Sequence, residues 1–270
     1  MSTKADEHAG WMRLIAGAYR WQRRLGHVVL ETPYCGIVTD PACPDLWDAN
    51  HADNVTANND EAIDTVLAAM DKYLAHTSWR IVHTDAFAPE LFLARLAYLG
   101  FKERPVVIQM LCHRLTVHGT SGVKIVELDD EKGWEALTEL VRRDVEEGRR
   151  TDHLDLDVDF IDSMIANYRA KAPDYRFHLA VVDGRALGYG AMATAPNGIG
   201  MIEDLFTLQH WRRRGIATTL IAHFDGKLRA SGCNAVFLGA VAREEAKLLY
   251  HKLGFRPAML TRCWVKEVMN

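Results

Sequence analysis

The segment 201–220 constrains this chain more than any other part of its sequence. An apolar stretch that carries two adjacent carboxylates runs into a basic loop and then into a helical pattern. In the loop, Arg212, Gly215 and Ala217 have the spacing R-x-x-G-x-A. A glycine without Cβ lets the backbone approach an anion closely, and the N–H groups that open a helix point at it. Arginines add charge-assisted hydrogen bonds, so the segment predicts a site for a phosphorylated cofactor.

A second segment predicts a buried strand over 235–241 and then a short amphipathic helix that stops at a glycine. Its residues 246–255 carry the pattern A-x-x-x-Y-x-x-x-G-F, with Tyr250 at the centre. A helix expected from Ile216 to about Ala230 joins this segment to the basic loop. The two patterns therefore lie in one continuous strand and helix order.

Together, the two patterns resemble the GNAT acyltransferase superfamily, in which a Q/R-x-x-G-x-G/A loop binds the pyrophosphate of acetyl-coenzyme A. The resemblance is specific from Val123 to the end of the chain and only architectural before it. It implies an acyltransferase that uses acetyl-coenzyme A as a co-substrate. One departure is Arg243, where the family often has an asparagine that contacts the cofactor arm. The cofactor-binding residues that the resemblance implies are Leu205, Phe206, Thr207, Arg212, Arg213, Arg214, Gly215, Ile216, Ala217, Thr218 and Arg243.

The chain contains a similar order of elements twice. In the second half, a strand over 123–130 and two helices precede a hairpin at Asp183-Gly184, which leads towards the basic loop. In the first half, a helix that stops at Gly100-Phe101 and a closing strand parallel the end of the chain. Such repetition indicates duplication. We therefore expect an α/β (α+β) protein of two GNAT-like domains, 1–118 and 119–270, each a mixed, mostly antiparallel sheet flanked by helices.

The first copy is expected to be degenerate. Residues 45–49 of the first copy are expected to correspond to residues 204–208 of the second copy, where the basic-loop segment begins. A helix is expected over about 61–75. Near the start of that helix, residues 58–60 read Asn-Asn-Asp where the second copy has arginines and glycine. Asp60 would repel a pyrophosphate. The catalytic site is therefore expected in the second copy.

Acetyl transfer to an amine needs a base, and two adjacent carboxylates precede the loop. In GNAT enzymes such as the polyamine acetyltransferases, a closely similar Glu-Asp-apolar-aromatic sequence supplies a glutamate as general base, often through water. The resemblance places Glu203 in this role, and burial can raise the pKa of a carboxylate towards neutrality. The alternative is a carboxylate paired with a surface arginine. Asp204 is the second candidate base, or it binds the cation of the substrate.

Successive side chains of a strand point to opposite faces of the sheet, which predicts the face on which each of these side chains lies. Glu203 is expected on the side of Leu205 and Thr207. Asp204 is expected on the opposite side, with Phe206. The backbone around residues 206–208 is expected to bind the pantetheine arm, and a local splay or bulge of the strand there would expose its polar groups.

The departing thiolate needs a proton. The resemblance implies that the phenol of Tyr250 hydrogen-bonds the sulfur and donates this proton. The alternative is a core aromatic residue whose hydroxyl is bonded elsewhere.

A run of carboxylates lies where GNAT folds border the acceptor cleft. A clustered negative surface would concentrate a cationic amine. A solvated helix end is the alternative, and Arg149 and Arg150 in the same stretch weaken the signal. The run consists of Asp144, Glu146, Glu147, Asp152, Asp155, Asp157, Asp159 and Asp162.

Composition excludes several other classes. A formal net charge of −4 gives no reason to expect nucleic acid as a partner. The five cysteines form no C-x-x-C pair and the histidines no zinc spacing, so neither disulfides nor a metal is expected. The N-terminal residues are charged and lack an apolar secretion core, and no apolar run approaches the roughly 18–20 residues of a membrane span, so we expect a cytoplasmic protein without a membrane partner. We expect it to be a monomer or a homodimer.

The expected function is transfer of acetyl from acetyl-coenzyme A to a primary amine of a small, cationic molecule. A protein lysine or amino-terminal acetyltransferase is the first alternative. A non-catalytic acyl-coenzyme A-binding or regulatory module is an alternative of another class. An enzyme needs Glu203 and Tyr250, whereas all three functions need the basic loop.

Overall fold

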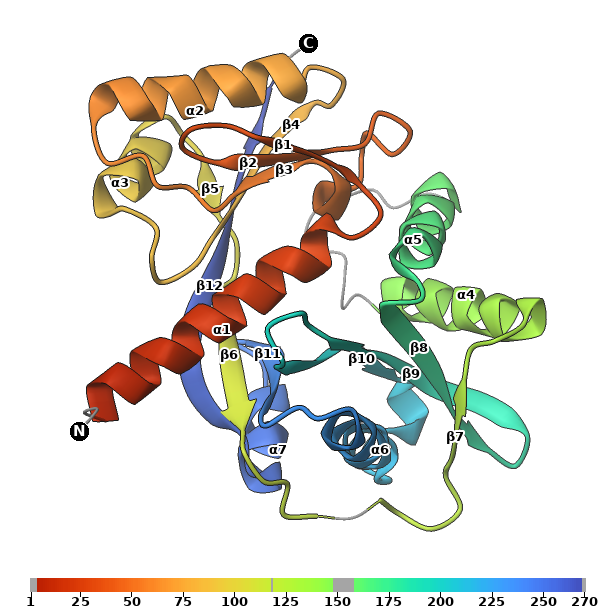
Figure 1. The fold of residues 1–270 in the computed structure, drawn as a ribbon. Helices are drawn as coiled ribbons and strands as arrows, with labels where there is room; N and C mark the ends of the chain where they lie inside the picture. The colour runs from red at the N-terminus through yellow and green to blue at the C-terminus, as the bar shows by residue number, and fades with distance from the viewer. Residues whose placement is uncertain (1–3, 118, 148–157, 269–270) are drawn as a thin grey trace. The chain divides into compact units, whose positions relative to one another are not determined.

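The computed structural model describes residues 4–117, 119–147 and 158–268 (Figure 1). These residues form two compact units. Unit 1 consists of Met1–Gln109, Ala240–Lys247 and Pro257–Asn270, and unit 2 consists of Met110–Gly239 and Leu248–Arg256. The first and the last described segments therefore both belong to unit 1.

Unit 1 has a sheet in the order β1-β2-β3-β4-β12, with β5 beside β12. All its described pairs are antiparallel except β3 with β4. Its elements are α1 (Lys4–Arg24), β1 (Val28–Glu31), β2 (Gly36–Thr39), η1 (Trp47–Ala49), β3 (His51–Asp53), α2 (Asp60–Tyr73), β4 (Trp79–Thr84), α3 (Glu90–Tyr98), β5 (Lys102–Glu103) and most of β12 (Arg256–Glu267).

Unit 2 has a sheet in the order β11-β10-β9-β8-β7, again antiparallel except for one pair, β10 with β11. Helices α4 and α5 lie on one side of this sheet and α6 on the other (Figure 1). Its elements are β7 (Lys124–Glu127), α4 (Glu131–Glu146), α5 (Val158–Lys171), β8 (Tyr175–Val182), β9 (Arg185–Thr194), β10 (Gly200–Thr207), η2 (Gln209–Trp211), α6 (Ile216–Ala230) and most of β11 (Val236–Val241) and α7 (Ala246–Leu253), while β6 (Val107–Cys112) is divided between the units.

Local sequence explains where several of these elements begin and end. The side chain of Asn59 accepts the backbone N–H of Ala62 and caps α2, and Asp130 caps α4 in the same way. Asp183 and Gly184 both have positive φ values, 49° and 76°, as the tight turn between β8 and β9 requires. The predicted helices and the hairpin are therefore present.

The two units confirm the predicted fold class of mixed, mostly antiparallel sheets flanked by helices. From the hairpin onwards, each copy follows the same order: two antiparallel strands, a third strand, a helix, a strand parallel to the third, and a further helix. One placement was wrong. Residues 45–49 do not correspond to the strand before the basic loop, because 47–49 form η1 and the corresponding strand is β3, which begins at His51.

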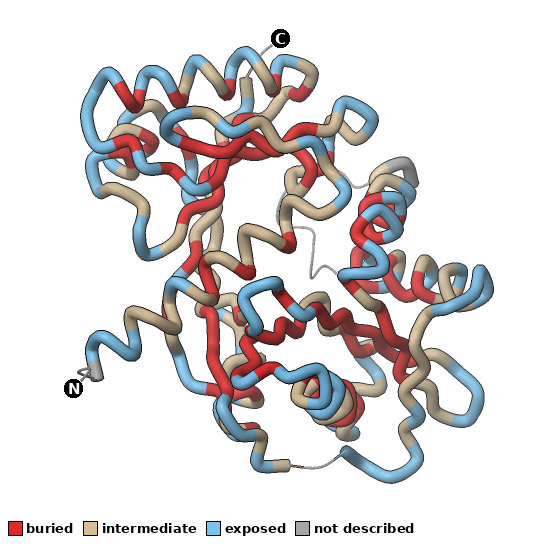
Figure 2. Tube along the Cα trace, in the orientation of Figure 1, coloured by how far each residue is buried: buried red, intermediate tan, exposed pale blue. Residues whose placement is uncertain are grey.

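The compact units do not follow the sequential division at residue 118, which itself lies outside the described residues. The last strand, β12, pairs with β4, from Arg262 opposite Thr84 to Glu267 opposite Trp79. Trp264 of β12 is part of the buried core of unit 1, seen as red segments in Figure 2. The end of the second copy therefore belongs to the sheet and core of unit 1.

Unit 1 also buries a histidine that predicts a dependence of stability on pH. His51 is fully buried, and burial lowers its pKa from 6.5 to about 4, against the opposing effect of Asp53 at 3.9 Å. Between these pH values, the unfolded chain binds a proton that the folded chain does not. The free energy of unfolding should therefore fall as the pH drops from 6.5 towards 4, by up to about 3 kcal/mol.

Urea unfolding at several pH values would measure this effect. The slope of the free energy of unfolding against pH should be smaller in His51→Gln than in the wild type. His8→Gln, which changes an exposed side chain of α1, is the control. An unchanged slope in His51→Gln would show that His51 is not responsible.

Candidate active site

The strand that carries the two carboxylates is interrupted by a β-bulge. Glu203 of β10 lies opposite Ala191 of β9, but Phe206 lies opposite Tyr189, so two residues of β10 face one residue of β9. Asp204 adopts a positive φ of 52° within this bulge. The bulge considered from the sequence is therefore present, between Glu203 and Phe206.

The bulge makes the predicted alternation of side chains wrong. Residues opposite each other in an antiparallel pair share a face, so Glu203 and Phe206 lie on the face of Tyr189 rather than on opposite faces. Thr207 pairs with Gly188 and lies on the other face. The extra residue shifts the two-residue period by one, which a pattern read along the chain does not show.

Strands β10 and β11 are paired over only part of their length. Their parallel register joins Gly200–Ile202 to Val236–Leu238, and β10 then continues to Thr207. The bulge with β9 begins one residue after this register ends. The edge of β10 beyond Ile202 that faces β11 therefore lacks this strand pairing. Binding of the cofactor arm by the backbone around residues 206–208 stays a prediction.

Tyr175, at the start of β8, joins the carboxylates and was missed by sequence reasoning. Its hydroxyl donates a hydrogen bond to Oδ2 of Asp204 at 2.8 Å. Burial, followed by the charges of Asp204 and Glu203, raises the pKa of Tyr175 well above 10. The phenol therefore stays protonated as a donor, and Glu203 and Asp204 both act on this one side chain.

A second phenol and carboxylate form a hydrogen-bonded pair between β9 and α4. The hydroxyl of Tyr189 donates to Oδ2 of Asp144 at 2.9 Å, and both residues are buried. Tyr189 lies on the same face as Glu203. This side of the sheet therefore brings together three carboxylates and two phenols, of which the buried Tyr189 and Asp144 are bonded to each other. No sequence signal indicated Tyr175 or Tyr189, because their partners lie 29 and 45 residues away.

The basic loop ends at the N-terminus of α6. Gly215 is the N-cap with φ 80° in the left-handed region, where a side chain would be strained. The first N–H groups of α6 have no intrahelical partner and are suited to an anion. Arg213 and Arg214 are exposed, and the guanidinium of Arg214 lies 4.8 Å from the ring centroid of Trp211. These features fit the pyrophosphate site that the sequence predicted.

The segment before β7 packs directly against this loop. A Cβ added to Gly215 would lie 2.1 Å from Oγ1 of Thr120. The backbone N–H of Thr120 donates to Oγ1 of Thr219 in α6 at 2.9 Å. The absence of a side chain at residue 215 is thus required by packing as well as by φ.

Two further predicted residues, Tyr250 and Arg243, lie on other segments of the chain. Tyr250 belongs to α7, is 8% exposed, and lies 6.4 Å from Phe255 between ring centroids. Arg243 is exposed and belongs to unit 1. The roles of Tyr250 as general acid and Arg243 as a cofactor contact stay predictions.

The predicted acidic run is not a uniform solvated surface. Asp144 is buried, Glu147 is bonded to the basic loop, and Glu146 pairs with Arg143 at 2.9 Å. Asp152, Asp155 and Asp157 lie outside the described residues. Across the described part of the chain, no cluster of three or more metal-ligating side chains could hold a metal ion. Nor does any described helix have the length and apolar character to cross a membrane.

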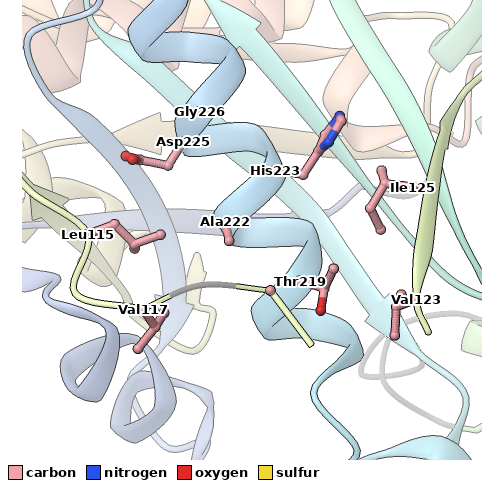
Figure 3. A pocket seen from close by; sticks show the side chains of 10 residues that line it. Leu115, Val117, Val123, Ile125, Thr219, Ala222, His223, Asp225 and Gly226 are labelled. Atoms are coloured by element: carbon pink, nitrogen blue, oxygen red, sulfur yellow. The ribbon is translucent and has the colours of Figure 1, made fainter. Parts of the chain in front are cut away.

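A cavity of about 510 Å³ lies away from the carboxylates, between the segment before β7 and the outer side of α6 (Figure 3). Leu115, Val117, Ile125 and Ala222 supply most of its apolar lining, with His223 beside them. Its lining includes neither Glu203 nor Tyr250.

The site and the fold agree with a known family. Residues 134–255 match the family model of the acetyltransferase (GNAT) family. The chain therefore carries a GNAT acetyltransferase domain and is an acyltransferase. No curated protein matches the chain at a significant level.

Solved structures show the same fold over almost the whole chain. A functionally unknown conserved protein from Staphylococcus epidermidis has a TM-score of 0.67 and 14% identity, covering 89% of this chain and 93% of its own. A GCN5-related N-acetyltransferase from Kribbella flavida has a TM-score of 0.61 and 15% identity, covering 94% and 95%. A tandem GNAT protein from the clavulanic acid biosynthesis pathway has a TM-score of 0.60 and 13% identity, covering 100% and 98%. The tandem arrangement thus has a structural precedent.

Proposed function

We propose that the protein transfers an acetyl group from acetyl-coenzyme A to a primary amine of a small, cationic molecule. The observation that carries this proposal is the bulge in β10. It places Glu203 on the face of Tyr189 and lets Asp204 reach Tyr175, beside the backbone that leads into the basic loop. The proposed anion site and the proposed amine site are therefore adjacent along one strand.

The chemistry divides among three side chains in this proposal. Glu203 removes a proton from the ammonium of the acceptor, and Asp204, held by Tyr175, provides a negative charge for the substrate cation. The amine nitrogen then bonds to the thioester carbonyl carbon and the C–S bond breaks. Tyr250 protonates the departing thiolate, and the nitrogen releases its remaining extra proton. The net products are an amide, coenzyme A and one proton.

Full-length protein with acetyl-coenzyme A and a panel of amines would test this function, with release of the free thiol as the readout. Polyamines and other small cationic amines should be acetylated faster than neutral amines. Faster acetylation of lysine-containing or amino-terminal peptides would favour the protein acetyltransferase instead. Tight binding of acetyl-coenzyme A without turnover of any amine would favour the non-catalytic module.

Tyr250→Phe should lower turnover while the affinity for coenzyme A stays within a few-fold. The phenol acts on a negative charge that develops only as the thiolate leaves, so its loss affects the transition state. Steady-state kinetics and calorimetry would measure the two quantities. Tyr73→Phe removes a phenol from α2 of unit 1 and is the matched control. Equal turnover in both variants would exclude Tyr250 as the general acid.

A further inference from the structure

The last turn of α4 is bonded to the basic loop through Glu147, the C-cap residue of the helix. One carboxylate oxygen of Glu147 accepts the backbone N–H of Gln209 at 2.8 Å. The other forms an ion pair with the guanidinium of Arg212. A single side chain therefore holds two points of the loop that precedes Gly215.

Arg212 is engaged within the protein on two sides. Its Nε donates to the backbone carbonyl of Thr207 at 3.0 Å, while its terminal nitrogen binds Glu147. The guanidinium thus joins the last residue of β10 to the end of α4. The side chain of Glu147 is 17% exposed and that of Arg212 is 36% exposed, so the carboxylate of this pair is shielded from solvent more than the guanidinium.

The same turn of α4 is also bonded to the face of the sheet that carries Glu203 and Tyr189. Asp144 lies three residues before Glu147, and residues three apart share a side of a helix. Asp144 accepts the hydroxyl of Tyr189, which lies on the face of Glu203. The last turn of α4 is therefore bonded both to the face of the sheet that carries Glu203 and to the basic loop.

We propose that Glu147 is a positioning residue for coenzyme A: it holds the loop 207–212 through Gln209 and Arg212, so that the N-terminus of α6 is presented to the pyrophosphate. Arg212 then serves the cofactor through the shape of the loop, rather than as a cation that contacts the phosphates. This inference rests on the proposed use of coenzyme A. It goes beyond that function because it assigns a role in cofactor binding to Glu147, the residue that ends α4.

Calorimetric titration of the full-length protein with coenzyme A would test the proposal. Glu147→Gln should weaken binding by about 5–30-fold, because a charge-assisted pair that fixes the loop is lost. Glu139→Gln is the matched control, since Glu139 pairs with Arg142 and Arg143 on the exposed side of the same helix. It should leave the affinity within about twofold. Melting temperatures of both variants would show that they are folded.

Two further variants separate positioning from direct contact. Arg212→Lys keeps the positive charge but loses the planar fork that bonds Thr207 and Glu147 together. It should weaken binding as much as Glu147→Gln does, and the double variant should be no weaker than the weaker single variant. Additive losses would contradict a shared role.

The outcomes distinguish this inference from the proposed function. If the wild type does not bind coenzyme A, the proposed function itself is wrong. If the wild type binds and Glu147→Gln binds equally well or more tightly, the inference fails while the function stands. Tighter binding would mean that Glu147 competes with the pyrophosphate for Arg212.

Discussion

Replacing Glu203 by glutamine is expected to lower turnover by about 10²–10⁴-fold, the usual contribution of general acid–base catalysis. The glutamine keeps the size of the side chain and removes its ability to take a proton. The deficit should shrink as the pH rises, because the acceptor amine then loses its proton without help. Rates of thiol release across a range of pH would measure both effects.

Asp204→Asn is the natural comparison, because the two carboxylates are adjacent on the same strand. Asp204 accepts a hydrogen bond from Tyr175, and an asparagine oxygen can accept it as well. Its replacement should therefore raise the KM for a cationic amine more than it lowers kcat. If Asp204→Asn instead shows the larger loss of kcat with the pH dependence described, Asp204 is the base.

Gly215→Asp is expected to weaken the binding of coenzyme A by about 100-fold or more. A side chain at this position meets a φ of 80° and would lie 2.1 Å from Oγ1 of Thr120. The aspartate also adds a negative charge where the pyrophosphate is expected, and two like charges in contact near a protein surface repel by several kcal/mol. Calorimetry would measure the loss.

Two alanine substitutions, Gly215→Ala and Gly226→Ala, separate the effect of the added charge from the effect of the added side chain. Gly215→Ala has the strain and the contact without the charge, so it should weaken binding less than Gly215→Asp. Gly226→Ala is the control within the same helix, because a Cβ added there meets no atom within 4 Å. It should raise the stability by about 0.5–1 kcal/mol and leave coenzyme A binding unchanged. Equal affinities in all three variants would show that the pyrophosphate binds elsewhere.

The sequence predicted those features of this protein that depend on residues close together in the chain. The hairpin at Asp183-Gly184 and the glycine before α6 were predicted from local backbone preferences. The caps at Asn59 and Asp130 were not predicted, although they arise from preferences of the same local kind. The helical and apolar periods placed the strands and helices around them. The basic loop and the second GNAT motif were recognisable for the same reason.

Only the tertiary structure determined how distant segments meet. The bulge in β10 depends on its register with β9, and it reversed the predicted faces of Phe206 and Thr207 relative to Glu203. Tyr175 meets Asp204 across 29 residues, and Glu147 meets Arg212 across 65. The pairing of β12 with β4 joins the last segment of the chain to the first copy. Strand register and long-range hydrogen bonds are fixed by how packed elements fit together, so a pattern read along the chain identifies the residues of this site but not their neighbours.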